Sequence, residues 1–190
     1  MLYGSPNPRR RDAQRNRSAI VRAAGEAMTT QRPAVGMSEI ARRAGVGQAT
    51  LYRHFPDRDA LTEAVIAYQI QRLELLITAG RGDPSTFRRV LDEMLRAQIT
   101  MRPLVHLVRR MDQRARRRFE HRIVSVLAEP LRRAQEGGCV RVDLVPSDLA
   151  LLFSMVEGVL EGASDADAAR RSIDLALDGV FRSVASTNVT

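Results

Sequence analysis

Five polar-tipped side chains lie within seven residues of one another, and their chemistry suits the bases and phosphates of DNA. They are Gln48, Thr50, Tyr52, Arg53 and His54. Arginine can donate two hydrogen bonds to the O6 and N7 atoms of guanine, and glutamine can bind adenine in the same bidentate way. Hydroxyl groups bind phosphate oxygens. A helix this short cannot form a core of its own, so its polar face predicts contact with a partner, which we interpret as DNA.

Two short helices joined by a glycine turn must position these side chains. Ile40 and the neighbouring alanines recur at helical spacing and predict a first helix with one narrow apolar stripe. Gly45 follows where a helix end needs a positive φ, which glycine adopts without a Cβ penalty. Leu51 and Phe55, four residues apart, give the second helix a buried side, and Asp57 can cap the next helix. The pattern predicts a helix-turn-helix, whose second helix can lie in the major groove.

The same stretch resembles the TetR family of bacterial transcriptional regulators. The shared pattern, AxxAGVxxxTLYxHFPxxxAL, begins at Ala41 and ends at Leu61. By this resemblance, Gln48, Ala49 and Arg53 occupy positions that face bases in the family. The positions that mostly hold phosphates in the family are occupied here by Thr50, Tyr52, His54 and Arg58.

Two glycines depart from the family pattern where a hydroxyl group is usual. Gly36 precedes the first helix, although Ser38 lies close by and is taken as a further DNA contact. Gly47 opens the second helix, where glycine is still a passable N-cap. These departures bear on individual phosphate contacts rather than on the motif.

The positive charge is concentrated on the segment that carries the motif. The chain has 190 residues, a net charge of +8 and no lysine. Residues 1–60 hold 11 arginines against 5 acidic residues, whereas residues 61–190 hold 19 against 17. An excess of +6 at the N-terminal end is what a phosphate backbone attracts, because neutralised phosphates release counterions.

The first residues are proline- and arginine-rich, and residues 1–11 are predicted to form a mobile basic arm. Together with Arg15 and Arg17, the arginines at 9–11 could place this arm in the minor groove. A solvated tail that adds only non-specific affinity is the alternative.

Helical periodicity recurs along the whole chain, and no strand-like alternation is present. We predict an all-α fold of about nine helices, with a helix-turn-helix domain at residues 12–58 and a second helical domain at residues 59–190. The family resemblance implies that this second domain senses a ligand and forms the dimer. Beyond the motif, the helices expected cover about 12–28, 60–79 (with Leu61, Val65, Tyr68, Leu73, Leu76 and Ile77 buried), 83–99, 104–110, 114–135 (kinked at Pro130), 149–162 and 165–184.

The segment 149–162 is apolar over much of its circumference, so it must be covered on several sides. We interpret it as half of a subunit interface, in which Gly158 and Gly162 allow a close helix crossing; an internal core helix is the alternative. The family resemblance implies a homodimer whose last two helices pair with those of the second subunit as a four-helix bundle.

Other reactive side chains lack the spacing that chemistry requires. His106, Asp112, Glu120 and His121 show no metal-ligand spacing, and no nucleophile signature accompanies them. We therefore expect neither an enzyme nor a cofactor. Cys139, the single cysteine, excludes an internal disulfide and fits a reducing cytoplasm. No apolar run is long enough to predict a membrane span or a secretion signal.

A second basic cluster covers residues 109–122. Arg110, Arg114, Arg117, Arg118 and His121 fall on one helical stripe, opposite Phe119, Ile123, Val126 and Leu127. A solvated face explains this arrangement best, and attraction of an anionic ligand or acidic partner remains open.

These observations predict a cytoplasmic homodimer that binds palindromic operator DNA and represses transcription until a small-molecule ligand releases it. A non-specific nucleoid-type binder and a helical enzyme with an incidental helix-turn-helix are the alternatives. Met and Phe at helical spacing fit either a pocket or plain core. The candidate pocket residues are Phe87, Met94, Gln98, Met101, His106, Phe119 and Phe153.

Overall fold

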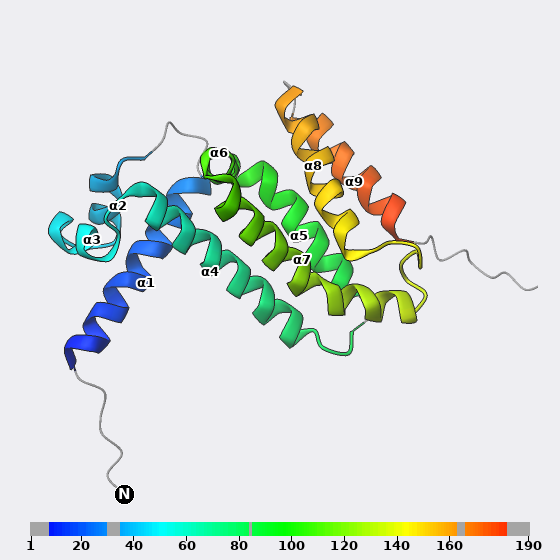
Figure 1. Cartoon of the computed structure of the whole chain (residues 1–190), viewed down its shortest axis with the longest axis horizontal. Helices are drawn as coiled ribbons and strands as arrows, with labels where there is room; N and C mark the ends of the chain where they lie inside the picture. Colours follow the sequence, from blue (N-terminus) through cyan, green and yellow to red (C-terminus); the bar gives the residue numbers. More distant parts are fainter. Residues whose placement is uncertain (1–7, 30–34, 84, 163–165, 182–190) are drawn as a thin grey trace, which may run out of the picture. The chain divides into compact units, whose positions relative to one another are not determined.

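The computed structural model describes residues 8–29, 35–83, 85–162 and 166–181, and within these ranges the chain forms nine helices and no named strand (Figure 1). The helices are α1 (Pro8–Thr29), α2 (Met37–Arg43), α3 (Gln48–His54), α4 (Arg58–Ala79), α5 (Thr86–Thr100), α6 (Arg102–Arg110), α7 (Gln113–Glu136), α8 (Pro146–Gly162) and α9 (Ala166–Val180). The predicted all-α class is confirmed.

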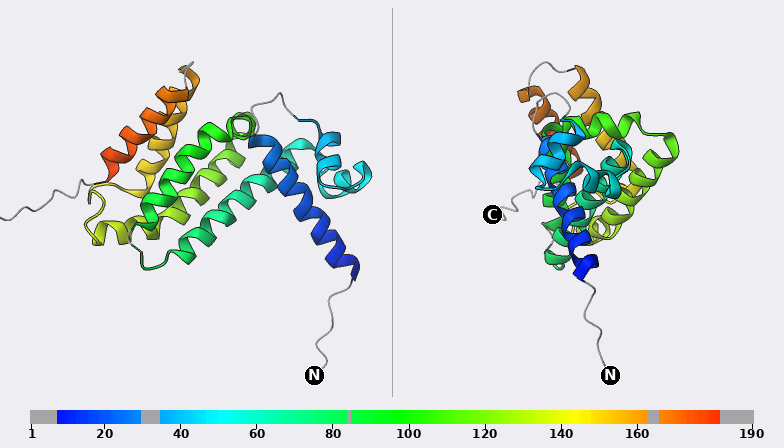
Figure 2. Two further views of the ribbon diagram at one scale, coloured as in Figure 1. Left: turned by 180° about the vertical axis from the view of Figure 1, so that it is seen from behind. Right: turned by 90° about the vertical axis from the view of Figure 1, so that its left-hand side faces the viewer.

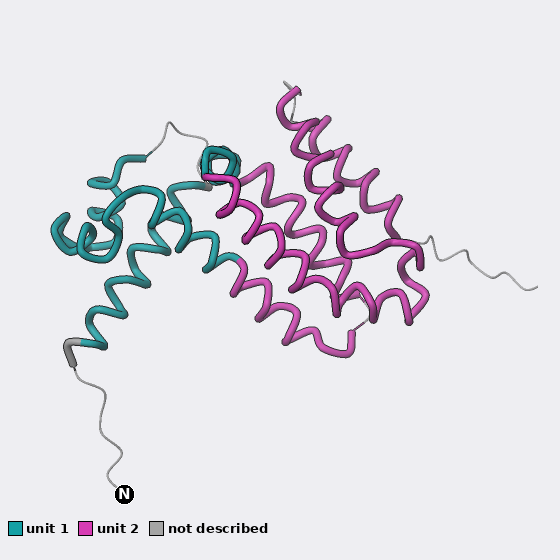
Figure 3. The backbone as a smooth tube through the Cα atoms, viewed as in Figure 1, with its two compact units in different colours: residues 1–69, 101–111 teal, residues 70–100, 112–190 magenta. Residues whose placement is uncertain are grey.

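The chain divides into two compact units (Figure 3). Unit 1 consists of residues 1–69 and 101–111, and unit 2 of residues 70–100 and 112–190. Helix α4 therefore begins in unit 1 and ends in unit 2. The domain boundary expected at residue 59 lies near the start of this helix, and α6, expected in the C-terminal domain, groups with unit 1.

Helix α1 is the centre of unit 1. Helices α2, α3 and α6 all pack against it, and the figures show α2 and α3 beside its middle (Figures 1 and 2). The predicted apolar stripe of α1 is buried, with Ile20 and Ala24 at zero exposure. Gly25 is also buried, and a Cβ built on it would lie 3.9 Å from Cγ1 of Val65, so α4 crosses α1 closely at this glycine.

Unit 2 is a bundle of α5, α7, α8 and α9, which also packs Leu73 and Ile77 of α4 against its core. The rings of Phe87 and Phe181 lie 5.7 Å apart between centroids, and Val140 pairs with Phe181 in an isolated antiparallel bridge. The fully buried side chains at the centre include Leu91, Leu95, Leu127, Leu149 and Ile173.

Several helix limits differ from the sequence expectation. Helix α1 begins at Pro8, so the arginines at 9–11 belong to a helix rather than to an arm; residues 1–7 lie outside the described part. Asp83 accepts a hydrogen bond from the Ser85 amide (2.8 Å), as an N-cap does, but regular α-helix starts only at Thr86. Pro84, Asp165 and Val184 are outside the described residues.

The buried stripe predicted for α4 is partly wrong. Leu61 and Val65 are completely buried, whereas Tyr68 and Leu76 are exposed. The reason is that α4 serves two units in succession, so its core-facing side shifts along its length. A single stripe drawn over the whole helix cannot describe both halves.

Helix α7 runs through Pro130, which is buried inside it, and ends at Glu136, close to the expected limit at residue 135. Gly137 is the C-cap and Gly138 has a φ of +70°. The basic stripe is also exposed as expected, but Arg110 ends α6 while the other members lie on α7, so the stripe does not follow one helix.

Candidate nucleic-acid interface

The turn between α2 and α3 has the geometry that the glycine pattern predicts. Gly45 adopts a φ of +66°. The amide of Val46 donates to the carbonyl of Ala41 over 3.0 Å, which satisfies a carbonyl at the end of α2 and turns the chain toward α3. A side chain at position 45 would strain this turn, because L-residues other than Gly and Asn rarely adopt such a φ.

Helix α3 has one side that packs in the core and one side that is exposed to solvent. Leu51 has zero exposure and Phe55, its C-cap residue, has 2% exposure. On the opposite side, four neighbouring side chains are exposed. They are Gln48, Ala49, Tyr52 and Arg53. These four share one helical face, as a surface that enters a groove must.

Two of the expected DNA contacts already interact within α3. The Nη2 atom of Arg53 donates to Oγ1 of Thr50 over 3.0 Å. Arginine has five N–H donors, so this bond orients the guanidinium and leaves donors for a base. Thr50 and His54 are half-buried, and Ser38 on α2 is exposed.

Arg58 makes an internal contact that the sequence did not indicate. Its Nη1 atom donates to the carbonyl of Val35 over 2.8 Å, in a partly buried position. This bond joins the start of α4 to the segment before α2. The predicted N-cap is present beside it, because Oδ1 of Asp57 accepts from the Ala60 amide at 2.8 Å.

A compact ion-pair group covers the outside of α2. Glu39 binds Arg42 at 2.7 Å and Arg43 at 2.9 Å. The hydrogen bonds from Arg42 and then Arg43 lower the pKa of Glu39 to about 2. The carboxylate of Glu39 therefore offsets one of these two positive charges and holds both arginines against α2. Their i, i+3 and i, i+4 spacing was a signal available in the sequence.

Arg17 has a structural role that differs from the expected arm. Its guanidinium carbon lies 5.2 Å from the centroid of the Phe55 ring, in a cation–π geometry. It therefore fastens α1 to the end of α3. No local pattern links positions 17 and 55, so the sequence could not reveal this contact.

The expected pocket residues fall in both units. Unit 2 holds Phe87, which is buried, and the half-buried Met94, Phe119 and Phe153. It also holds Gln98, whose Oε1 atom is buried without a hydrogen-bond partner.

The other two expected pocket residues belong to unit 1. Met101 is buried, at 9% exposure, and His106 is exposed. His106 is therefore not part of the core of unit 1. The ligand pocket itself stays a prediction.

Unit 2 contains a cavity of about 310 Å³ between the turn after α4 and the end of α7. Of the residues expected to line a ligand pocket, only Phe87 lines this cavity. Ile77, Phe87, Pro130 and Ala134 supply apolar lining, and charged residues share the rest.

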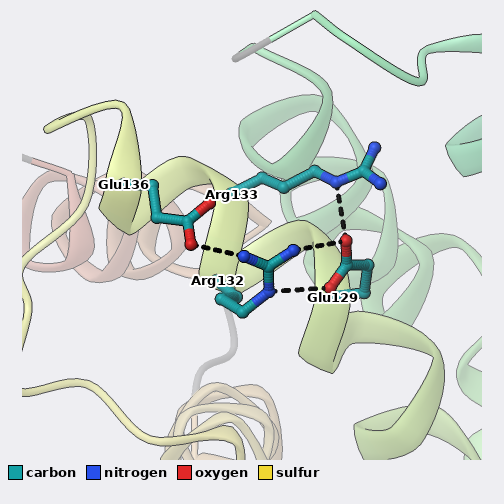
Figure 4. Close-up of polar contacts among 4 residues, drawn as sticks. All are labelled: Glu129, Arg132, Arg133 and Glu136. Carbon is teal, nitrogen blue, oxygen red and sulfur yellow. Dashed lines mark hydrogen bonds and ion pairs between the residues drawn. The ribbon is translucent and has the colours of Figure 1, made fainter.

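Figure 4 shows the charged group that borders this cavity. Arg132 lies between Glu129 and Glu136, and Nε of Arg133 donates to Glu129 over 2.7 Å. Hydrogen bonds from Arg132 and then Arg133 lower the pKa of Glu129 to about 2. With its carboxylates already bound to arginines, the border offers no free acid–base pair.

Unit 2 also displays an apolar stripe on its last two helices. Leu151 and Met155 of α8 are 63% and 67% exposed, and Val159 and Leu175 are exposed as well. No atom lies within 4 Å of a Cβ built on Gly158 or Gly162. Apolar side chains exposed together in this way are typical of surfaces that bind a partner or a ligand.

The reactive residues outside these surfaces do not form a catalytic or metal-binding group among the described residues. Asp112 caps α7 by accepting from the amides of Ala115 (3.0 Å) and Arg114 (2.9 Å), and these bonds lower its pKa. Among the described residues, no group of three or more His, Cys, Asp and Glu side chains could hold a metal. No described helix is both long and apolar enough to cross a membrane.

Two family models match this chain. Residues 20–65 match the model described as bacterial regulatory proteins of the tetR family, and residues 84–182 match the SbtR-like transcriptional regulator C-terminal domain. The first match contains all eight expected DNA contacts, which lie on α2, α3 and α4. The second covers slightly more than half of the chain.

Known proteins are similar over the motif and over the whole fold. An HTH-type transcriptional regulator of Mycobacterium tuberculosis is 50% identical over 52 residues, and this match spans about a quarter (26%) of either chain. A TetR regulator structure from Mycobacterium vanbaalenii is 29% identical, with a TM-score of 0.69 over 92% of this chain and 100% of that one. One from Streptomyces coelicolor is 26% identical, with a TM-score of 0.62 over 88% and 99%.

Proposed function

Because this chain belongs to the TetR family of bacterial regulatory proteins, we propose that it binds inverted-repeat operator DNA as a homodimer and represses transcription until a small-molecule ligand releases it. The observation that carries the proposal is the division of α3 into a buried side at Leu51 and an exposed side at Gln48, Ala49, Tyr52 and Arg53. The proposed role requires no catalysis, and its place of action is the cytoplasm.

Arg53 is proposed as the principal base contact. It is exposed, and its bond to Thr50 limits the directions in which the guanidinium can point. A bidentate contact to guanine contributes about 1–3 kcal/mol of discrimination against other bases. Gln48 and Ala49 are proposed to face neighbouring bases, and Tyr52 and His54 to hold phosphates.

Arg58 has a structural role beside its proposed phosphate contact, because it also binds Val35. A guanidinium that donates to a backbone carbonyl over 2.8 Å still has other donors for a phosphate. Replacement of Arg58 would however also loosen the start of α4, so it is a poor test of phosphate binding alone.

Dimerisation is proposed through the exposed stripe of α8 and α9. Leu151, Met155, Val159 and Leu175 give it an apolar centre, and Gly158 allows close approach of a second helix. Two-fold symmetry would place the two α3 helices about one DNA turn apart, roughly 34–36 Å, or a multiple of it.

The ligand is proposed to bind in unit 2, near the half-buried Met94, Phe119 and Phe153 and the partnerless Gln98 oxygen. By linkage, a ligand that weakens DNA binding must itself be weakened by DNA to the same degree.

Selection of the purified protein against random duplex DNA at near-physiological salt tests the proposal. We expect an inverted repeat with fixed half-site spacing, and we expect Arg53→Ala to lose preference at one position of each half-site. Tight, salt-sensitive binding without any enriched sequence would instead identify a non-specific binder and refute the proposal.

A further inference from the structure

We propose that the outer face of α1 is a second DNA-binding surface, which holds phosphates of the backbone that flanks the sequence read by α3. The residues of this surface are Arg11, Arg15, Ser18 and Arg22, and we call it the α1 stripe. The inference rests on the proposed function, since it assumes that unit 1 docks on DNA.

The α1 stripe is a continuous exposed face. Its members recur at i, i+4, i+7 and i+11, so they lie above one another on the side of the helix away from the buried Ile20. All four are exposed, and with Gln14 they border one open depression. Arg11 and Arg22 lie about 16 Å apart along the helix axis at 1.5 Å per residue.

The positive charge of this stripe is not neutralised within the protein. Helix α1 contains six arginines against two acidic residues. Arg11, Arg15 and Arg22 have no hydrogen-bond or ion-pair partner among the described residues. This contrasts with α2, where both Arg42 and Arg43 form ion pairs with Glu39.

The charges in the first turns of α1 destabilise this helix. The first turn contains no acidic residue, although the positive end of the helix dipole favours one. Arg11 and Arg15 are like charges four residues apart, which repel. Residues 10–15 are all exposed, so packing does not compensate for these costs. Bound phosphates would reduce both the repulsion between Arg11 and Arg15 and the unfavourable interaction of these arginines with the helix dipole.

The position of α1 in unit 1 fits a shared contact surface. Helix α3 packs against α1, and Arg17 stacks on Phe55 at the end of α3. The first turns of α1 extend beyond the helix-turn-helix at the end of the unit where α3 lies, in both the front and the end-on view (Figures 1 and 2). A duplex docked on α3 that extends along this end of the unit would pass the first turns of α1, where Arg11 and Arg15 lie.

The salt dependence of operator binding tests this inference. Each phosphate contact contributes about 0.9 to the slope of log K against log salt concentration, so R11Q/R15Q should reduce the slope by about 3.6 for a dimer. The charge-matched control R81Q/R171Q, at exposed positions of unit 2, should leave it within one unit. Glutamine has nearly the helix propensity of arginine, and circular dichroism verifies that helix content is kept.

The length of the duplex provides the second measurement. Trimming the flanking base pairs should lower the slope of the unchanged protein to that of R11Q/R15Q. Equal slopes for R11Q/R15Q and the control, on the sequence that the unchanged protein selects, would overturn the role of the α1 stripe and leave operator binding intact. Failure of the unchanged protein to select any sequence would count against the proposed function instead.

Discussion

Replacement of Leu51 by alanine should weaken the packing of α3 against the rest of unit 1. Leu51 is the only fully buried residue within α3, which has seven residues. Isolated helices shorter than about 12–15 residues are marginal in water, so packing must hold α3 in place. Loss of a buried leucine side chain costs about 2–5 kcal/mol. At about 1.4 kcal/mol per tenfold change, operator affinity should fall by at least about 30-fold.

Binding and hydrogen exchange together test this reasoning. Operator affinity would be measured by fluorescence anisotropy, and exchange of the amides of residues 48–54 by NMR or mass spectrometry. Leu75→Ala is the matched control, because Leu75 is also a helical leucine but is 69% exposed, and surface changes usually stay within about 0.5 kcal/mol. Unchanged affinity and unchanged exchange in Leu51→Ala would refute the view that this side chain orders α3.

Four further predictions concern stability and assembly. Gly25→Ala should stabilise the protein by up to about 1 kcal/mol in chemical denaturation, because the new methyl meets side chains only at 3.7 Å and beyond; destabilisation would contradict the crossing geometry. Gly80→Ala should destabilise it, because the new Cβ would lie 2.2 Å from a hydroxyl oxygen. Glu129 has a folded pKa of about 2 against an ordinary 4.5, so its contribution to stability is present above pH 4.5 and is lost as the pH falls toward 2. Denaturation curves of Glu129→Gln should lack this part of the acid dependence, and identical pH profiles would contradict it. Leu151→Glu combined with Met155→Glu should give a folded monomer in sedimentation analysis, and a persistent dimer would exclude this surface as the interface.

Local features of the motif could be predicted from the sequence because each depends on neighbouring residues. The positive φ of Gly45, the N-cap at Asp57 and the burial of Leu51 and Phe55 all follow from spacing within a few residues, and the structure confirms them. The exposed face of α3 then follows by elimination from its buried side.

Contacts between distant positions could not be predicted in the same way. The bond from Arg58 to Val35 joins residues 23 apart, and the stacking of Arg17 on Phe55 depends on how α1 crosses α3. Exposure of His106 depends on which side of α6 packs on α1, which its apolar neighbours in sequence did not reveal. Such features require the tertiary arrangement itself.

The buried and exposed residues of α3 are different residues, so the exposed ones can change independently. Its core contacts depend on Leu51 and Phe55, whereas Gln48, Ala49 and Arg53 contribute nothing to the buried interior. Substitutions at the latter three positions can therefore accumulate with little cost in folding. A library randomised at these sites alone should yield mostly folded proteins with different half-site preferences, so that new target genes can be acquired without rebuilding the scaffold.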